Sequence, residues 1–231
     1  MVFQQQSERV CEVYAAALDA WAAGEHTLST DEMTGIQALE LAAPTKPLRP
    51  GQVEKREFEY IRHGTQTLIA NMNVATGQLV NPSVGATRTE ADFVAHISQT
   101  IATDPQAKWT FVLDQLNTHQ SEGLVRLVAQ HCHFPGDFGI KDKSGILKSM
   151  PSRAAFLADP THRIRFVYTP KHSSWLNQIE IWFSTLMRRL LKRGSFTSVD
   201  DLRQRILTFI AFFNRTAKPY KWTFKGRPLQ T

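Results

Sequence analysis

The segment KWTFVLD, residues 108–114, constrains the fold more than any other part of the sequence. Its fully apolar centre is typical of a strand in the middle of a sheet that is covered on both faces. The run ends at Asp114, and a carboxylate is costly to bury unless a positive group meets it. The segment therefore predicts a central strand with an acid at its end. Asp114 either caps the following helix or turn, or holds a metal ion.

Hydrophobic periodicity assigns the other elements around this strand. Apolar residues at steps of three and four predict five helices. Three span residues 5–23, 121–132 and 175–194, and two begin after N-caps at Thr89 and Ser198. Further strands are predicted at 26–32, within 57–80 as an antiparallel pair with turns at Gly64 and Gly77, and at 162–168. Loops are predicted at 41–51 and 81–89, and residues 134–163 lack a regular pattern. Antiparallel strands followed by alternating helices and strands predict an α/β protein with a mixed sheet.

The charge of the chain favours a polyanionic partner. The net charge is +6 and the sequence pI is about 9.5, which points first to nucleic acid. Basic residues gather in MRRLLKR, residues 187–193, and in the lysines of 141–153. No apolar run is long enough for a membrane helix, and the length is enough for one large domain or for one domain with appendages. The two cysteines fit a reducing cytosol, and the HCH segment at 131–133 is a poor metal motif because adjacent side chains diverge.

Three acids come from distant parts of the sequence. Asp31 ends the first predicted strand, Asp114 ends the central one, and Glu180 borders the apolar face of a helix. Each has an ordinary explanation as a turn, cap or helix-boundary residue. If the strands are adjacent, however, the three acids converge. Such hard oxygen ligands suit magnesium or manganese, and two such ions can clamp a phosphodiester.

Four segments carry a resemblance to a known family: STDEMTGIQALE, FVLDQLNTHQSEG, YTPKHSSWLNQIEIWFSTL and AFFNRTAKPYKW. From about residue 25 onward the chain resembles the catalytic half of a bacterial insertion-sequence transposase, in the mariner-related branch of the DDE superfamily. The resemblance implies a ribonuclease-H-like fold with three antiparallel strands, two further strands and flanking helices. It also implies that Asp31, Asp114 and Glu180 bind two Mg²⁺ ions, with Mn²⁺ as a substitute. The implied reactions are hydrolysis of DNA phosphodiesters at transposon ends and strand transfer into target DNA.

The same resemblance sets expectations for partners and organisation. It implies double-stranded DNA as the partner, a homodimer when active, a cytoplasmic bacterial enzyme, no membrane association and no small-molecule cofactor. Residues 1–24 are expected to be a linker helix, the remnant of a missing DNA-binding region, and 25–231 the catalytic domain. Residues 134–163 are expected to be an insertion. Gln115 departs from the family pattern, because many relatives have asparagine directly after the second acid.

Several further residues are expected near the site. Asn117 and Asn177 either orient metal ligands or contact phosphate, or serve only as turn and cap residues. His119 either moves protons or is a satisfied loop histidine. Glu32 points away from Asp31 if its strand continues, and otherwise is a second candidate ligand.

Basic side chains are expected to bind DNA on both sides of the acid helix. They are Lys171 and His172 before the helix and Arg188, Arg189, Lys192 and Arg193 at its end, although the last four also suit a helix C-terminus without DNA. Trp175 is expected in the core. Two alternatives to a transposase stay open: a nuclease of the same fold without strand transfer, and an inactive remnant that only binds DNA.

Overall fold

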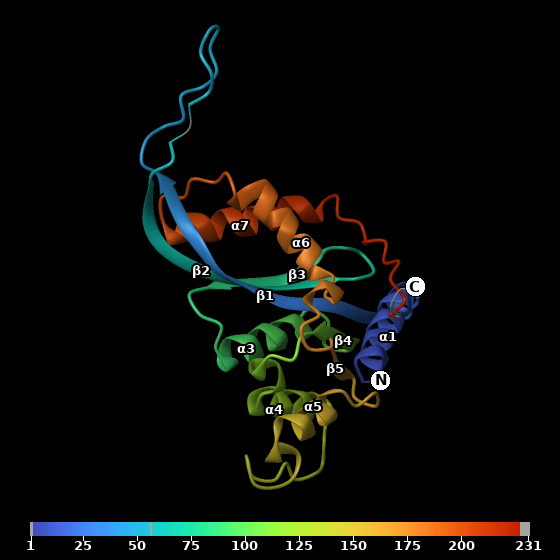
Figure 1. Ribbon diagram of the computed structural model, residues 1–231. Helices are drawn as coiled ribbons and strands as arrows, with labels where there is room; N and C mark the ends of the chain where they lie inside the picture. The colour runs from blue at the N-terminus through green and yellow to red at the C-terminus, as the bar shows by residue number, and fades with distance from the viewer. Residues whose placement is uncertain (1, 56, 227–231) are drawn as a thin grey trace.

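A five-stranded mixed sheet forms the centre of the molecule (Figure 1). The computed structural model describes residues 2–55 and 57–226. The strand order is β3-β2-β1-β4-β5; β1, β2 and β3 are antiparallel, and β4 and β5 run parallel to β1. The strands are β1 (Glu25–Leu41), β2 (Tyr60–Asn73), β3 (Leu79–Gly85), β4 (Lys108–Leu113) and β5 (Ile164–Tyr168). This topology confirms the predicted mixed sheet.

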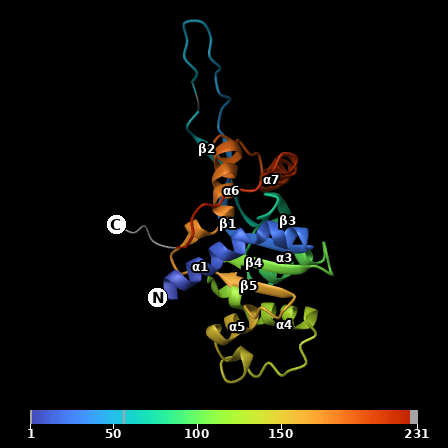
Figure 2. The same ribbon diagram turned by 90° about the vertical axis from the view of Figure 1, so that its right-hand side faces the viewer.

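Helices cover both faces of the sheet (Figures 1 and 2). On one face lie α3 (Glu90–Ile101), α4 (Glu122–His131) and α5 (Met150–Leu157), over a core that includes Phe93, Phe111 and Phe166. On the other face lie α6 (Ile179–Leu186) and α7 (Val199–Asn214), packed on the apolar side chains of β1 and β2. The N-terminal helices α1 (Val2–Ala15) and α2 (Ala17–Ala22) complete this second face, where Val10 and Tyr14 meet Val112 and Val167.

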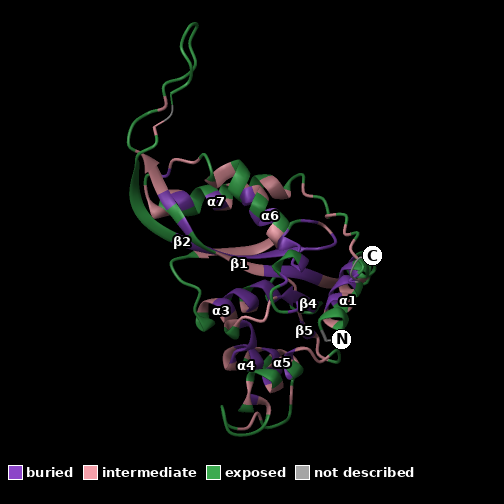
Figure 3. Ribbon diagram, viewed as in Figure 1, coloured by how far each residue is buried: buried purple, intermediate pink, exposed green. Residues whose placement is uncertain are grey.

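Burial is greatest in the centre of the sheet (Figure 3). All five residues of β4 from Trp109 to Leu113 are buried, as predicted for a central strand. The predicted N-caps also form: Thr89 and Asp92 make a reciprocal capping box, and Ser198 accepts a hydrogen bond from the Asp201 amide. In the described part of the chain, no helix is long and apolar enough to cross a membrane.

Several boundaries predicted from the sequence are wrong. β1 runs seventeen residues from Glu25 to Leu41, so Asp31 lies inside the strand and does not end it. Gly64 is not a turn; it lies within β2 at φ +119°, where a Cβ would be 3.2 Å from Val199 Cγ1. Residues 81–85 are not loop but belong to β3, with Pro82 tolerated because β3 is an edge strand.

The helical predictions also need correction. The N-terminal helix is broken at Ala16 into α1 and α2. The predicted helix at 175–194 is a 3₁₀ turn at Ser174–Leu176, then α6, then a π-helical segment at Met187–Leu191. Residues 134–163 contain α5 and bury Leu147 and Leu157 in the core, so this region is more regular than predicted.

A long exposed arm joins β1 to β2. Residues 42–55 and 57–59 extend far beyond the sheet in both views (Figures 1 and 2). Isolated bridges between Lys46 and Lys55 and between Arg49 and Gln52 hold its two limbs together. The predicted proline-rich loop at 41–51 forms one limb of this arm. The predicted catalytic domain, 25–231, includes residues 56 and 227–231, which lie outside the described residues.

Candidate functional site

Three carboxylates come from the three elements that meet where β1 and β4 diverge. β1 pairs with β4 up to Ser29, and Asp31 follows two residues later on β1. Asp114 comes directly after β4, and Glu180 lies in the first turn of α6. All three are partly covered by protein. Parallel strands place their carboxyl ends at one edge of a sheet, which is where α/β proteins carry their sites.

The charges of these three acids are coupled. Burial, together with the charges of Asp114 and Glu180, raises the pKa of Asp31 to about 7, against the lowering effect of a hydrogen bond from the Glu32 amide. Burial also raises the pKa of Glu180, and the charge of Asp114 adds to this effect. Like charges disfavour ionisation of their neighbours only when they are near each other. The acids therefore share one electrostatic environment.

Asn177 fixes the first acid against the start of α6. Its amide nitrogen donates to the Asp31 carboxylate at 3.1 Å and to the Thr30 carbonyl at 2.8 Å. Its amide oxygen accepts from the Ser29 hydroxyl, and that hydroxyl in turn accepts from the Ile179 amide at 2.9 Å. Asn177 is almost fully buried. This network joins β1 to the helix that carries Glu180.

His119 lies beside the second acid, between two carboxylates. Its Nδ1 is 2.8 Å from Asp114 Oδ1, and its Nε2 is 3.1 Å from Glu32 Oε1. Burial alone would lower the pKa of His119, but the hydrogen bonds to Asp114 and Glu32 outweigh it and raise the pKa to about 9. Burial alone would raise the pKa of Asp114, but His119 outweighs it and holds that pKa below its ordinary value.

The chemistry of the acids fits a hard divalent cation. Among residues 2–55 and 57–226, no three His, Cys, Asp or Glu side chains lie close enough together to hold a metal ion as they stand. The donors are nevertheless three carboxylates whose mutual repulsion raises the pKa of two of them. A cation among them would remove that repulsion. Asp31, Asp114 and Glu180 are therefore the residues that could hold magnesium or manganese.

The other residues predicted for the site have different surroundings. Asn117 is exposed and lines a small cavity of about 220 Å³ with Lys141 and Arg153. Gln115 turns away from the acids and donates to the Thr169 carbonyl at 2.9 Å. Trp175 is 53% exposed and packs edge-on against Phe224, so its predicted place in the core is wrong.

The basic residues predicted to bind DNA are exposed. Lys171 and His172 lie in the turn before α6. Four more lie on or just after the π-helical segment, and we call them the basic cluster: Arg188, Arg189, Lys192 and Arg193.

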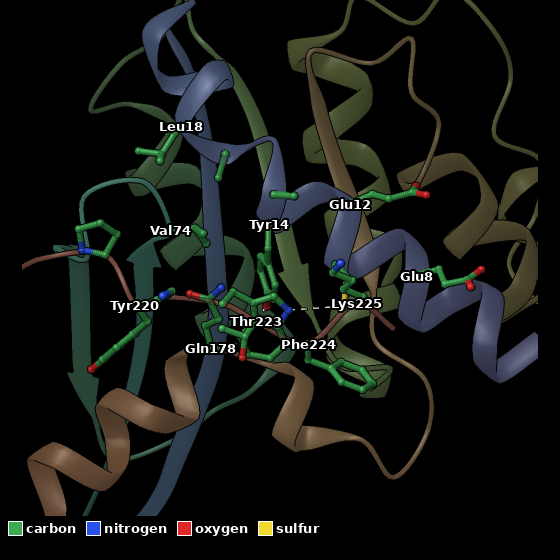
Figure 4. Close-up of a pocket in the computed structure, with 16 residues that line it drawn as sticks. Glu8, Glu12, Tyr14, Leu18, Val74, Gln178, Tyr220, Thr223, Phe224 and Lys225 are labelled. Carbon is green, nitrogen blue, oxygen red and sulfur yellow. Dashed lines mark hydrogen bonds between the residues drawn. The ribbon is translucent and has the colours of Figure 1, made fainter. Parts of the chain in front are cut away.

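A larger cavity lies on the far side of the turn that leads into α6 (Figure 4). It measures about 970 Å³ and is lined by α1, α2, the Val74 turn and the C-terminal segment 219–225. Tyr14 lines this cavity, and its hydroxyl donates to the Leu176 carbonyl at 3.0 Å. The Gln178 amide is fully buried here, and neither of its polar atoms has a partner among the described residues.

The pairing of Glu32 with His119 was not predicted from the sequence. Glu32 follows Asp31 on β1, so the two side chains point to opposite faces of the sheet. The Glu32 side chain is only 2% exposed. The sequence contained the signal for its direction, which is strand alternation, but not for its contact with a residue far along the chain.

The sheet order, the flanking helices and the carboxylates define the class of the protein: an α/β protein with a ribonuclease-H-like fold and an acidic site. Residues 26–203 match the family model described as the DDE superfamily endonuclease, and the chain belongs to that family. No curated protein matches the sequence.

Solved structures of the Mos1 transposase have a similar fold. The Mos1 mariner paired end complex with Mn superposes with a TM-score of 0.52 at 12% identity, over 90% of this chain and 55% of that one. A pre-cleavage Mos1 transpososome superposes with a TM-score of 0.53 at 11% identity, over 90% of this chain and 56% of that one. The Mos1 transposase catalytic domain with Raltegravir and Mn superposes with a TM-score of 0.53 at 9% identity, over 91% of this chain and 82% of that one. This chain therefore spans about half the length of the Mos1 chains in the complexes and most of the catalytic domain.

Proposed function

We propose that this chain is the catalytic domain of a DNA transposase. In this proposal, Asp31, Asp114 and Glu180 hold two Mg²⁺ ions, for which Mn²⁺ can substitute. The observation that carries it is the electrostatic coupling of three acids that lie within β1, directly after β4 and in the first turn of α6, in a chain of the DDE endonuclease family. A set of acids that raise one another's pKa is stable when a multivalent cation is bound among them.

The reaction would cut and then join DNA at transposon ends. Attack of water on a phosphodiester breaks the bond from phosphorus to the 3′ oxygen and frees a DNA 3′-hydroxyl. Attack of that hydroxyl on a target phosphodiester forms a new bond from its oxygen to the target phosphorus and breaks the target's own bond from phosphorus to the 3′ oxygen, which leaves as a 3′-hydroxyl of the target strand. The bound ions would supply activation of the attacking oxygen and compensation of charge at phosphorus.

The residues of this chain have distinct tasks in the proposal. Asn177 orients the Asp31 carboxylate and ties it to α6. His119 holds Asp114 at one oxygen, Oδ1, so the other oxygen is left to face a cation. Asn117 lies at the mouth of the small cavity beside α4, where it can contact a phosphate.

The proposed DNA surface flanks α6. Lys171 and His172 would contact the strand that is cut, and the basic cluster would contact the duplex backbone further along. Phosphate contacts of this kind hold the duplex in register without reading its sequence. A homodimer would bring two such sites to two transposon ends, as the Mos1 paired end complexes hold paired ends in their own case.

The first test is metal-dependent cleavage of supercoiled plasmid with matched variants. Wild type should nick the plasmid with Mn²⁺ or Mg²⁺, and Asp114→Asn should reduce nicking by at least about a hundredfold, because a metal ligand is lost. Asp19→Asn, which changes an exposed acid on α2, is the control and should nick as wild type does.

Two further readouts separate the proposal from its alternatives. Calorimetric titration should show Mn²⁺ binding to wild type and to Asp19→Asn but not to Asp114→Asn, while all three bind DNA. Joining of an oligonucleotide with a free 3′-hydroxyl to plasmid, assayed separately, distinguishes a transposase from a nuclease that only cuts. Equal nicking by Asp114→Asn, or no Mn²⁺ binding by wild type, would refute the proposal.

A further inference from the structure

Glu32 is a buried carboxylate that the proposed chemistry does not use. It lies next to Asp31 on β1 but on the opposite face of the sheet, with its side chain 2% exposed. A carboxylate so far from water is costly unless it is paired. Its side-chain partner is His119, whose Nε2 lies 3.1 Å from Glu32 Oε1.

The His119 ring is fixed on all sides. Its other ring nitrogen faces Asp114 Oδ1 at 2.8 Å, and the ring is fully buried. The Phe93 ring packs on it with a centroid separation of 4.3 Å. The Tyr168 hydroxyl donates to the His119 carbonyl at 2.9 Å and anchors the backbone. A histidine held in this way has little freedom to rotate.

The fixed ring in turn limits how Asp114 can turn. Asp114 Oδ1 receives two contacts, from His119 Nδ1 at 2.8 Å and from the Leu116 amide at 2.9 Å. Both are made to the same oxygen, so they define the plane and direction of the carboxylate. Without the histidine, only the local contact to Leu116 would remain on that oxygen.

We propose that Glu32 is a positioning residue that locks the His119 ring and, through it, aims the Asp114 carboxylate. Glu32 itself is not a metal ligand in this proposal. His119 lies between Glu32 and Asp114, and the Glu32 side chain points to the face of the sheet opposite that of Asp31. The inference rests on the proposed role of Asp114 in metal binding. Groups that orient a metal ligand from behind typically change metal affinity or activity by about 10- to 100-fold when they are removed.

The test compares two glutamates on β1, each of which pairs with a histidine from another element. Glu32→Ala should weaken Mn²⁺ binding by about 10- to 100-fold in calorimetric titration of the folded chain. Glu32→Gln should recover most of that affinity, because an amide can still bond to His119 Nε2. Glu40 pairs with His63 at 2.7 Å at the far end of β1, so Glu40→Ala is the matched control and should bind Mn²⁺ as wild type does.

A double variant shows whether Glu32 acts through His119. Glu32→Ala combined with His119→Ala should bind Mn²⁺ no more weakly than His119→Ala alone. Wild-type affinity in Glu32→Ala, or losses that multiply in the double variant, would overturn the inference. Circular dichroism checks that each variant is folded. If Glu32→Ala does not fold, Glu32→Asp replaces it, with the same loss and the same coupling expected because its carboxylate falls one methylene short.

Asp114→Asn, measured in the same titrations, distinguishes a failure of the positioning role from a failure of the proposed function. Loss of Mn²⁺ binding in Asp114→Asn but not in Glu32→Ala refutes the positioning role and leaves the proposed function intact. Unchanged Mn²⁺ binding in Asp114→Asn refutes both. Loss in both variants, with Glu40→Ala unaffected, supports both.

Discussion

Folding of the chain should depend on keeping His96 uncharged. His96 lies on α3 and is 1% exposed; its Nδ1 contacts the Ser83 hydroxyl at 2.8 Å, and its Nε2 has no partner among the described residues. Burial lowers the pKa of His96 from its ordinary 6.5 to about 3. The folded state therefore keeps the ring neutral at pH values where the unfolded chain protonates it.

The sign and size of the effect follow from proton linkage. Between about pH 6.5 and 3 the unfolded state binds more protons at His96, so the free energy of unfolding falls as the pH falls through this range. Each unit of pH below 6.5 costs about 1.4 kcal/mol, so at pH 5 this one group removes about 2 kcal/mol. That is a large fraction of the stability of a typical domain.

Urea denaturation at pH 7 and pH 5 measures this contribution. His96→Asn keeps a polar atom near Ser83 but cannot be protonated, so it should lose about 2 kcal/mol less than wild type between the two pH values. His133→Asn replaces an exposed histidine in the turn after α4, at a φ of 51° that asparagine tolerates, and is the control, with a pH dependence close to that of wild type. Equal losses in wild type and His96→Asn would refute the claim that burial keeps His96 neutral.

Two other predictions concern the site and its DNA surface. Asn177→Ala should lower the free energy of unfolding by about 3 kcal/mol, because it leaves the buried Ser29 hydroxyl and Thr30 carbonyl without their amide partner; a loss below about 1 kcal/mol in urea denaturation would contradict that network. Replacing the basic cluster with glutamine should reduce the slope of log affinity against log salt by about 3 to 4, since each phosphate contact contributes about 0.9. Fluorescence anisotropy with duplex DNA measures this slope, and an unchanged slope would place the DNA elsewhere.

Local sequence patterns were sufficient where local physics decides the structure. The strand β4 could be assigned from its apolar run because a strand buried on both faces needs continuous apolar residues. The N-caps at Thr89 and Ser198 were predicted because their hydroxyls satisfy the free amides of the first helical turn. The order of these elements was enough to predict the mixed sheet.

Patterns failed where a distant neighbour overrides a local preference. Asn81 and Pro82 normally indicate a loop, yet an edge strand tolerates a missing amide, and β3 is at the edge. Gly64 normally indicates a turn, yet β2 continues through it, paired with β1 in an irregular register. The second half of β1 was missed because its strand character depends on pairing with β2, which the local sequence does not encode.

For the site, the sequence by itself determined the kinds of residue that could do the chemistry. Three acids, their amide neighbours and the basic side chains were all identified, because metal and phosphate chemistry requires those groups. Only the tertiary structure decided which of them lie in contact with one another. Asn177 donates to Asp31, far earlier in the chain. His119 joins Asp114 to Glu32, which lies 87 residues before His119 in the sequence. Such contacts depend on the register and spacing of strands that pair across the sheet, and no local pattern specifies that register.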